Sequence, residues 1–186
     1  MKRFFIAACL ATLAASGCTN TEQTSVSSNT ATDAAPTTNA VEAAPPEPGT
    51  SGGLPDDRAP ISEPKGAIDP KSAEAAGQAM QSYGALIEQK RFAEAEQFWG
   101  DRAAAKPFSD GLRANRENHL QVGKPSGMEG AAGSSYVTVP IVLYGIDSAG
   151  KSFSRSGEAV LRRVNDVPGS TEAQRRWHIE QLKLPG

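Results

Sequence analysis

The chain has 186 residues, a formal net charge of −2 at pH 7, two cysteines and two histidines. This length is sufficient for one domain with a core of its own and for additional segments. A charge so close to neutral provides no strong basic field, so we expect no nucleic-acid partner. So few cysteines and histidines make a poor set of metal ligands, and we expect no metal and no cofactor.

The first residues have the pattern of an export signal. Lys2 and Arg3 precede an apolar run, Phe4–Ala15. A membrane-spanning helix needs roughly 20 apolar residues, so this run is too short to cross the hydrocarbon core. A positive start, a short apolar run and small residues before a cleavage site are typical of a secretory signal peptide. We place this signal at residues 1–17.

The end of the signal, Ala15-Ser16-Gly17-Cys18, resembles the lipobox of bacterial lipoproteins. The resemblance implies that Cys18 is lipidated and becomes the first residue after cleavage, and two or three acyl chains make a stable membrane anchor. Ala15 departs from the pattern, because lipoboxes prefer Leu at that position. Ile6-Ala7-Ala8-Cys9 fits the letters better but leaves too short an apolar segment before it. An ordinary signal peptide with an incidental cysteine is the alternative interpretation.

The residue after the lipidated cysteine bears on localisation. In enterobacterial lipoproteins an Asp at that position retains the protein in the inner membrane, whereas this chain has Thr19. The resemblance therefore favours the outer membrane over the inner membrane. We expect a chain that is anchored in the cell envelope and faces the periplasm.

Residues 18–69 comprise the lipidated cysteine and a tether rich in Thr, Ser, Ala and Pro. The tether has no aromatic residue, and its apolar residues stand alone, so it cannot bury enough surface to offset the entropy of ordering. Eight acidic residues against two basic ones give it a net charge of −6. We expect a disordered acidic spacer of roughly 40 Å average span. A docking peptide for a partner is the alternative.

Residues 70–186 remain for a single domain, and their first part has helical periodicity. Asp69-Pro70 is a signal for a helix start, because Asp caps free N–H groups and Pro suits the first turn. Apolar residues then recur at intervals of four, three and four, which predicts one buried stripe; they are Ala76, Met80, Tyr83 and Ile87. Two shorter helices are expected over residues 92–99 and 107–118.

After residue 118 the apolar period changes from helical to two, which predicts strands. A strand is expected at residues 119–122, and residues 135–144 form the clearest one, with Val137, Val139, Ile141 and Leu143 on one face. Pro140 lacks an N–H donor and favours an edge position or a bulge. Strands over residues 152–164 and 175–184 follow as antiparallel neighbours. The fold class is therefore α+β, with the N-terminal helices packed on one face of a curved, cone-like antiparallel sheet.

This order of elements resembles the nuclear-transport-factor-2-like superfamily, the cystatin-like fold of ketosteroid isomerase and the SnoaL-type cyclases. The resemblance covers residues 70–184 and implies a pocket between helices and sheet. The candidate pocket residues are Tyr83, Tyr136, Tyr144 and Trp177. Ketosteroid isomerase needs a carboxylate base and a buried Tyr with a protonated acid. Asp101 and Asp110 are candidate carboxylates, but no motif brings them together with a Tyr, so we assign no catalytic residue.

Two arginine pairs flank the predicted loop between the last two strands. They are Arg162-Arg163 and Arg175-Arg176. Together they predict a patch for an anion or an acidic partner. Because alternation along a strand sends one arginine of each pair to each face, a solvated strand surface is the alternative. His178 is expected to point away from its neighbour Trp177 and to face solvent.

These features indicate a membrane-anchored envelope lipoprotein that presents a non-catalytic α+β domain to a protein partner or a small apolar ligand. One alternative is an isomerase or hydrolase that uses the pocket of the cone, with Tyr or Asp in acid–base roles. The other alternative is a structural accessory of an envelope complex.

Overall fold

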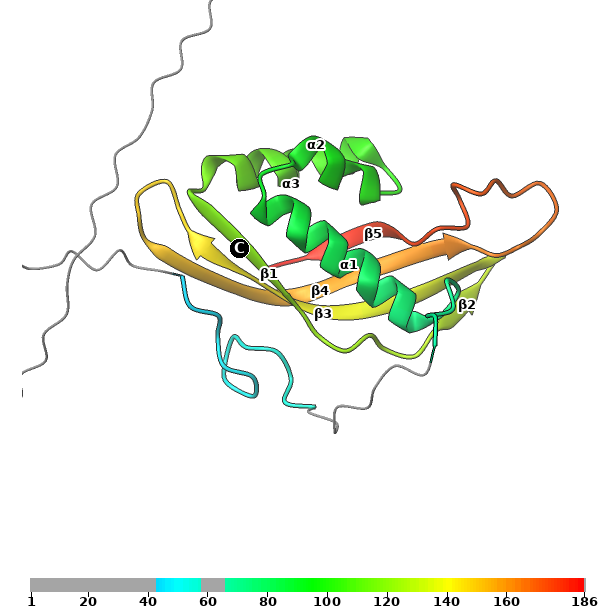
Figure 1. Ribbon diagram of the computed structural model, residues 1–186, viewed down its shortest axis with the longest axis horizontal. Helices are drawn as coiled ribbons and strands as arrows, with labels where there is room; N and C mark the ends of the chain where they lie inside the picture. Colours follow the sequence, from blue (N-terminus) through cyan, green and yellow to red (C-terminus); the bar gives the residue numbers. More distant parts are fainter. Residues whose placement is uncertain (1–42, 58–65, 186) are drawn as a thin grey trace, which may run out of the picture. The chain divides into compact units, whose positions relative to one another are not determined.

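The structure is a computed structural model that describes residues 43–57 and 66–185 (Figure 1). The predicted signal peptide, Cys18 and most of the predicted tether lie outside the described residues. Within residues 43–57, the Gly49 N–H donates to the Leu54 carbonyl at 2.8 Å and the Gly53 N–H to the Thr50 carbonyl at 3.1 Å, so this part of the chain forms turns. No helix in the described ranges combines the length and apolarity needed to cross a membrane.

The first helix, α1, spans Ala73–Glu88. It begins later than the Asp69-Pro70 signal predicts, because Ser72 caps it and its hydroxyl accepts the Ala75 N–H at 3.2 Å. The Asp69 carboxylate instead accepts the Lys71 N–H at 2.9 Å in the preceding turn. The predicted stripe of α1 is confirmed, since all four of its residues are at most 1% exposed.

The next helical segments are α2 (Phe92–Ala95), the 3-10 helix η1 (Glu96–Phe98) and α3 (Arg102–Ala114). Helix α3 begins and ends earlier than predicted. Asp101 caps it by accepting the Ala103 N–H at 2.8 Å, and Pro107 lies in its interior rather than in its first turn. Pro107 is exposed and supplies no N–H to the Ala103 carbonyl four residues earlier in the helix.

The strands form one antiparallel sheet in the order β1-β3-β4-β5, with β2 paired to the start of β3. Short, exposed β2 was not predicted within its Gly-rich stretch. The predicted antiparallel succession of the last three long strands is confirmed. The bounds are β1 Glu117–Val122, β2 Glu129–Ala131, β3 Ser134–Ile146, β4 Ser152–Val164 and β5 His178–Lys183.

Pro140 lies on a strand inside the sheet rather than at its edge. On one side of β3, pairing with β1 stops at Ile141 and pairing with β2 stops at Tyr136. Pro140 lies in the gap between these two stretches, where its carbonyl accepts the Gly123 N–H at 2.8 Å. The ladder requires no donor from Pro140 there, so the gap takes the place of the predicted edge position.

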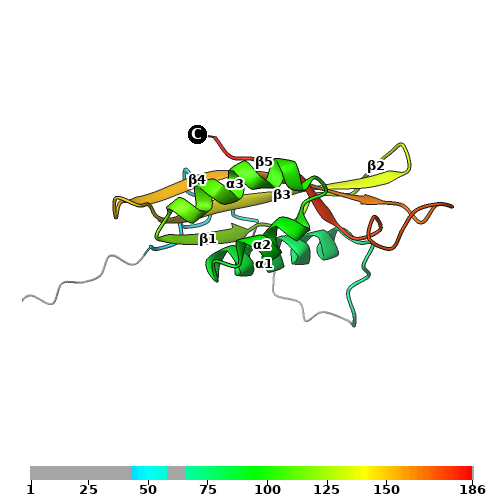
Figure 2. The same ribbon diagram turned by 90° about the horizontal axis from the view of Figure 1, so that it is seen from above.

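All three α-helices lie on one face of the sheet (Figures 1 and 2). The predicted inward face of β3 is confirmed: its four apolar residues are at most 3% exposed and pack in one cluster with the α1 stripe. The fold class is therefore α+β, with helices packed against an antiparallel sheet, as predicted. Cluster residues also come from β5 and from the segment after η1, and this end of the sheet contains the site described next.

Candidate functional site

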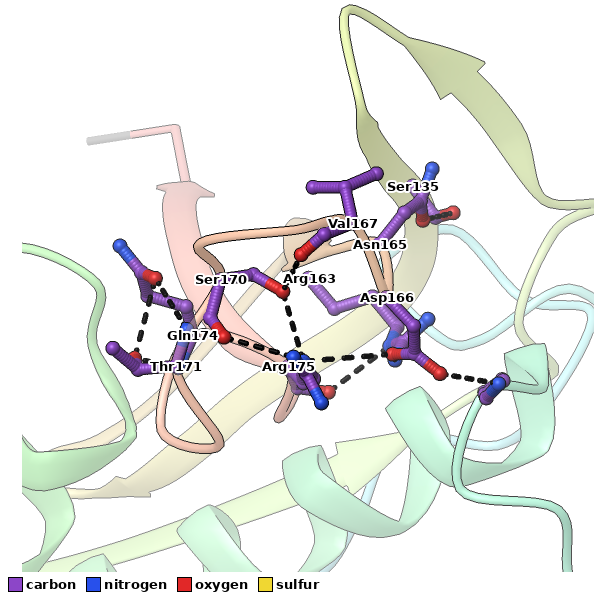
Figure 3. A network of polar contacts seen from close by, with 10 residues as sticks. Ser135, Arg163, Asn165, Asp166, Val167, Ser170, Thr171, Gln174 and Arg175 are labelled. Carbon is purple, nitrogen blue, oxygen red and sulfur yellow. Dashed lines mark hydrogen bonds and ion pairs between the residues drawn. The ribbon is translucent and has the colours of Figure 1, made fainter.

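A network of polar contacts holds the loop between β4 and β5 (Figure 3). Its centre is Asp166, whose carboxylate pairs with Lys71 and accepts from Arg163 Nη2 at 3.0 Å. Hydrogen bonding to Lys71 and then to Arg163 holds the pKa of Asp166 below its usual range. Arg163 is only 5% exposed, and its Nε also donates to the Arg175 carbonyl at 3.0 Å. Arg163 therefore joins both ends of the loop to β4.

The middle of the loop is held by its own side chains. Arg175 donates from Nε to the Ser170 hydroxyl and from Nη2 to the Ser170 carbonyl, both at 2.8 Å. The Gln174 side-chain oxygen accepts the Thr171 N–H at 2.9 Å. A loop fixed in this way can position binding groups on a rigid scaffold. The residues that it positions are Ala173, Arg176 and Trp177.

The end of this loop lies against the chain that follows η1. Trp99 forms a parallel bridge with Ile179, and the Gly100 N–H donates to the Ile179 carbonyl at 3.0 Å. This pairing brings η1 and the start of α3 beside the start of β5. Two adjoining cavities open here, and Ala173 and His178 line both of them.

The first cavity has a volume of about 290 Å³ and contains a compensated charge. Arg162 and Glu180 both line it, and Arg162 Nη1 lies 4.0 Å from the Glu180 carboxylate. Arg162 is also engaged elsewhere: its Nε donates to the Ser134 hydroxyl at 3.2 Å, and its guanidinium lies 5.9 Å from the Tyr136 ring centroid. The positive charge of Arg162 in this cavity is therefore already balanced by Glu180.

The second cavity has a volume of about 410 Å³ and differs in charge. Among the described residues, those that line it include Arg102 and Arg176 and no Asp or Glu. Neither guanidinium forms a hydrogen bond or ion pair with the described residues. The other lining residues are Gln97, Phe98, Trp177 and the two shared residues.

Both tryptophans of the chain line this pair of cavities, Trp99 the first and Trp177 the second. Their residues are 7% and 6% exposed, and both indole N–H groups lack a hydrogen-bond partner. A buried donor without a partner costs about 1–3 kcal/mol. Both indole nitrogens are shielded from solvent, and that of Trp99 lies beside the Tyr83 hydroxyl in the core.

The four predicted pocket residues do not lie together. Tyr83 is buried between α1 and η1, with its ring centroid 6.5 Å from that of Phe98. Tyr136 and Tyr144 alternate with the inward residues of β3 and therefore lie on the opposite face of the sheet. Tyr144 stacks on His119 there, with ring centroids 5.1 Å apart. Among the four, Trp177 lines the second cavity.

The Tyr83 hydroxyl is buried in the core and has no hydrogen-bond partner. Burial raises the pKa of Tyr83 well above its usual range, while the Trp99 indole opposes this shift and the Glu96 carboxylate adds to it. The hydroxyl and the Trp99 N–H are neighbours, yet neither meets hydrogen-bond geometry. Tyr83 thus remains protonated in the core.

The four predicted patch arginines separate into two pairs by role. Arg163 and Arg175 hold the loop, whereas Arg162 and Arg176 line the first and the second cavity. Alternation correctly predicts that Arg162 and Arg163 face opposite sides. Arg102 was not predicted, because no local pattern links it to a loop so distant in the sequence.

The candidate carboxylates both stabilise α3. Asp101 caps the helix, and Asp110 pairs with Lys106 at 3.3 Å and Arg113 at 2.7 Å. These partners, Lys106 first, hold the pKa of Asp110 below its usual range. No cluster of three or more His, Cys, Asp or Glu side chains within the described ranges is arranged to hold a metal.

No protein-family model matches this chain. No curated protein matches it either. Among solved structures, it is similar to a nuclear transport factor 2 (NTF2-like) superfamily protein from Salmonella enterica serovar Typhimurium, with 10% identity, a TM-score of 0.47, and coverage of 61% of this chain and 89% of that one. It is also similar to an NTF2-like protein of unknown function from Exiguobacterium sp. 255-15, with 12% identity, a TM-score of 0.39, and coverage of 57% and 98%.

Proposed function

We propose that this chain is a lipid-anchored envelope protein that presents a non-catalytic binding domain to the periplasm. The anchoring half of the proposal rests on the lipobox-like residues that end at Cys18, and Thr19 favours the outer membrane. The binding half rests on the paired cavities beside β5. Partner or ligand would be held at these cavities while the acyl chains keep the domain at the membrane.

The non-catalytic character is supported by what the candidate acid–base residues do instead. Asp101 and Asp110 are engaged with the backbone and side chains of α3. Tyr83 is buried in the core and forms no hydrogen bond with the carboxylate of Asp101 or Asp110. Neither Asp101 nor Asp110 lines either of the two cavities beside β5, so no carboxylate of this pair is presented to a ligand there.

The single observation that carries the binding proposal is the second cavity. Arg102 and Arg176 make no hydrogen bond or ion pair with the described residues, and both line a cavity of about 410 Å³. Ligand pockets typically measure roughly 300–1,000 Å³ and combine apolar walls with a few polar groups. Cationic groups that the fold does not use are available for a ligand.

The anchor is tested by labelling cells with an alkyne fatty acid and separating membranes from soluble protein. We expect the wild-type chain to carry label in the membrane fraction and Cys18→Ser to lose the label. The matched control is Cys9→Ser, which removes the other cysteine and should remain labelled. A labelled Cys18→Ser chain would refute lipidation at this position.

The binding half is tested by native mass spectrometry of the lipidated chain purified in detergent from the bacterium that makes it. We expect a bound small molecule or protein with the wild type. The double variant Arg102→Gln/Arg176→Gln should lose it. A bare wild-type chain, or equal occupancy of both proteins, would contradict binding at this cavity.

A further inference from the structure

The two cavities beside β5 differ in the chemistry that they offer. In the first cavity, the Glu180 carboxylate lies 4.0 Å from Arg162 and compensates its charge. In the second, Arg102 and Arg176 face a space of about 410 Å³ that no acidic side chain of the described residues lines. An anionic group is therefore favoured in the second cavity over the first.

The donors of the second cavity define the polar end of its ligand. A guanidinium offers only donors, in a planar fork that matches a carboxylate with two parallel hydrogen bonds. A ligand that satisfies these groups must supply acceptor oxygens and negative charge, which a purely apolar ligand lacks.

The aromatic residues that line the same cavity define the apolar end of its ligand. Phe98 and Trp177 are the aromatic residues that line it, and Trp177 is only 6% exposed. Aromatic rings bind flat apolar groups and also accept cation–π contacts from arginine. From these observations we infer that the second cavity binds a small amphipathic anion, with its oxyanion at Arg102 and Arg176 and its apolar body against Phe98 and Trp177. This inference rests on the binding half of the proposed function and names the ligand class.

Two dyes with the same ring skeleton test this inference: anilinonaphthalenesulfonate, which is anionic, and N-phenylnaphthylamine, which is neutral. The protein is the full chain carrying Cys18→Ser, so that no acyl chain binds dye. Tryptophan is excited and dye emission is recorded, which reports dye bound to the domain that holds Trp99 and Trp177, the two tryptophans of the chain. We expect saturable binding of the anionic dye and binding at least about tenfold weaker of the neutral one.

Single substitutions then locate the anion. Arg102→Gln and Arg176→Gln should each weaken binding of the anionic dye about tenfold and leave the neutral dye unaffected. The matched control is Arg155→Gln, which also removes one exposed arginine but lines a separate cavity between α3 and the β3–β4 hairpin. This control should change affinity by less than about twofold. Equal losses for Arg155→Gln and Arg176→Gln would overturn the inference, because they would indicate nonspecific attraction.

The outcomes separate this inference from the proposed function. If both dyes bind alike and ignore the arginines, the cavity binds ligands but not anions, and this inference fails alone. If neither dye binds, this inference fails, and the native mass spectrometry described above decides the binding half of the proposed function. A second measurement is NMR of the tryptophan indole N–H signals during titration with naphthoate. The Trp177 signal, assigned with Trp99→Phe, should shift in the wild type, and an unmoved signal would also overturn the inference.

Discussion

Replacing Arg163 with methionine should destabilise the domain strongly although it changes a single charged residue. The Arg163 side chain is 6% exposed, and it donates to the Asp166 carboxylate and to the Arg175 carbonyl at 3.0 Å each. Methionine fills similar volume but donates nothing. The substitution therefore leaves a backbone carbonyl of the loop without its donor and removes one cation from Asp166.

The magnitude follows from how much of this network is shielded from water. Removing one partner of a buried ion pair costs about 3–5 kcal/mol, and a hydrogen bond to a charged group contributes about 1.5–3 kcal/mol. Asp166 is 39% exposed and retains Lys71, so solvent and that partner recover part of the loss. We expect the free energy of unfolding to fall by about 2–3 kcal/mol, which corresponds to roughly 8–12 °C in Tm for a domain of this size.

Urea unfolding followed by circular dichroism measures this difference. The matched control is Arg162→Met, the adjacent residue of β4, whose side chain is 40% exposed on the other face. Its loss should remain below about 1 kcal/mol, as for exposed ion pairs. If Arg162→Met and Arg163→Met unfold at the same urea concentration, the buried network does not hold the loop and the reasoning is wrong.

The pH dependence of stability gives a second readout of the same network. Lys71, and then Arg163, lower the pKa of folded Asp166, so the unfolded chain binds its proton first as pH falls. The stability from this group is present above the unfolded pKa of about 3.9 and is lost as pH falls through the folded pKa. Asp166→Asn should therefore be less stable than wild type at neutral pH, and the difference should shrink as pH falls below the unfolded pKa and through the lowered folded pKa of Asp166. A difference that persists in acid would count against the ion pairs.

Five further substitutions test the packing of the core and the cap of α3. Gly145→Ala places a Cβ 2.1 Å from the Glu117 carbonyl oxygen and should lower the free energy of unfolding by about 1–3 kcal/mol. The Cβ of Gly111→Ala in α3 meets nothing within 4 Å, and this substitution should stabilise the domain by about 0.5–1 kcal/mol. Thermal melts that rank the two variants in reverse would contradict this. Asp101→Ala should lower stability by about 1 kcal/mol and Asp101→Asn should not, because Asn also caps; equal losses in urea would indicate another role. Tyr83→Phe removes a buried hydroxyl without a partner and should be neutral or stabilising by up to about 1 kcal/mol. A clear loss on calorimetry would mean that this hydroxyl has a partner.

Element boundaries were predicted less well than element faces, and α3 shows why. Pro107 suits a first helical turn, so the sequence favoured a start there. Asp101 is also a capping residue, and its carboxylate accepts the Ala103 N–H, so the helix begins there although Pro107 lies in its interior. Two local signals competed, and apolar periodicity by itself does not choose between them. The same holds for Asp69 and Ser72 at the start of α1, where the serine caps the helix.

The sequence by itself determined the fold class, the inward faces of α1 and β3 and the opposite orientations of Arg162 and Arg163. Periodicity is sufficient for these features because each depends on neighbours a few residues apart. Only the tertiary structure decided that Arg102 and Arg176 line one cavity while Arg163 and Arg175 hold a loop. These two arrangements depend on the pairing of the segment after η1 with β5 and on the Asp166 network. Such contacts join residues far apart in the chain, and no local pattern encodes them.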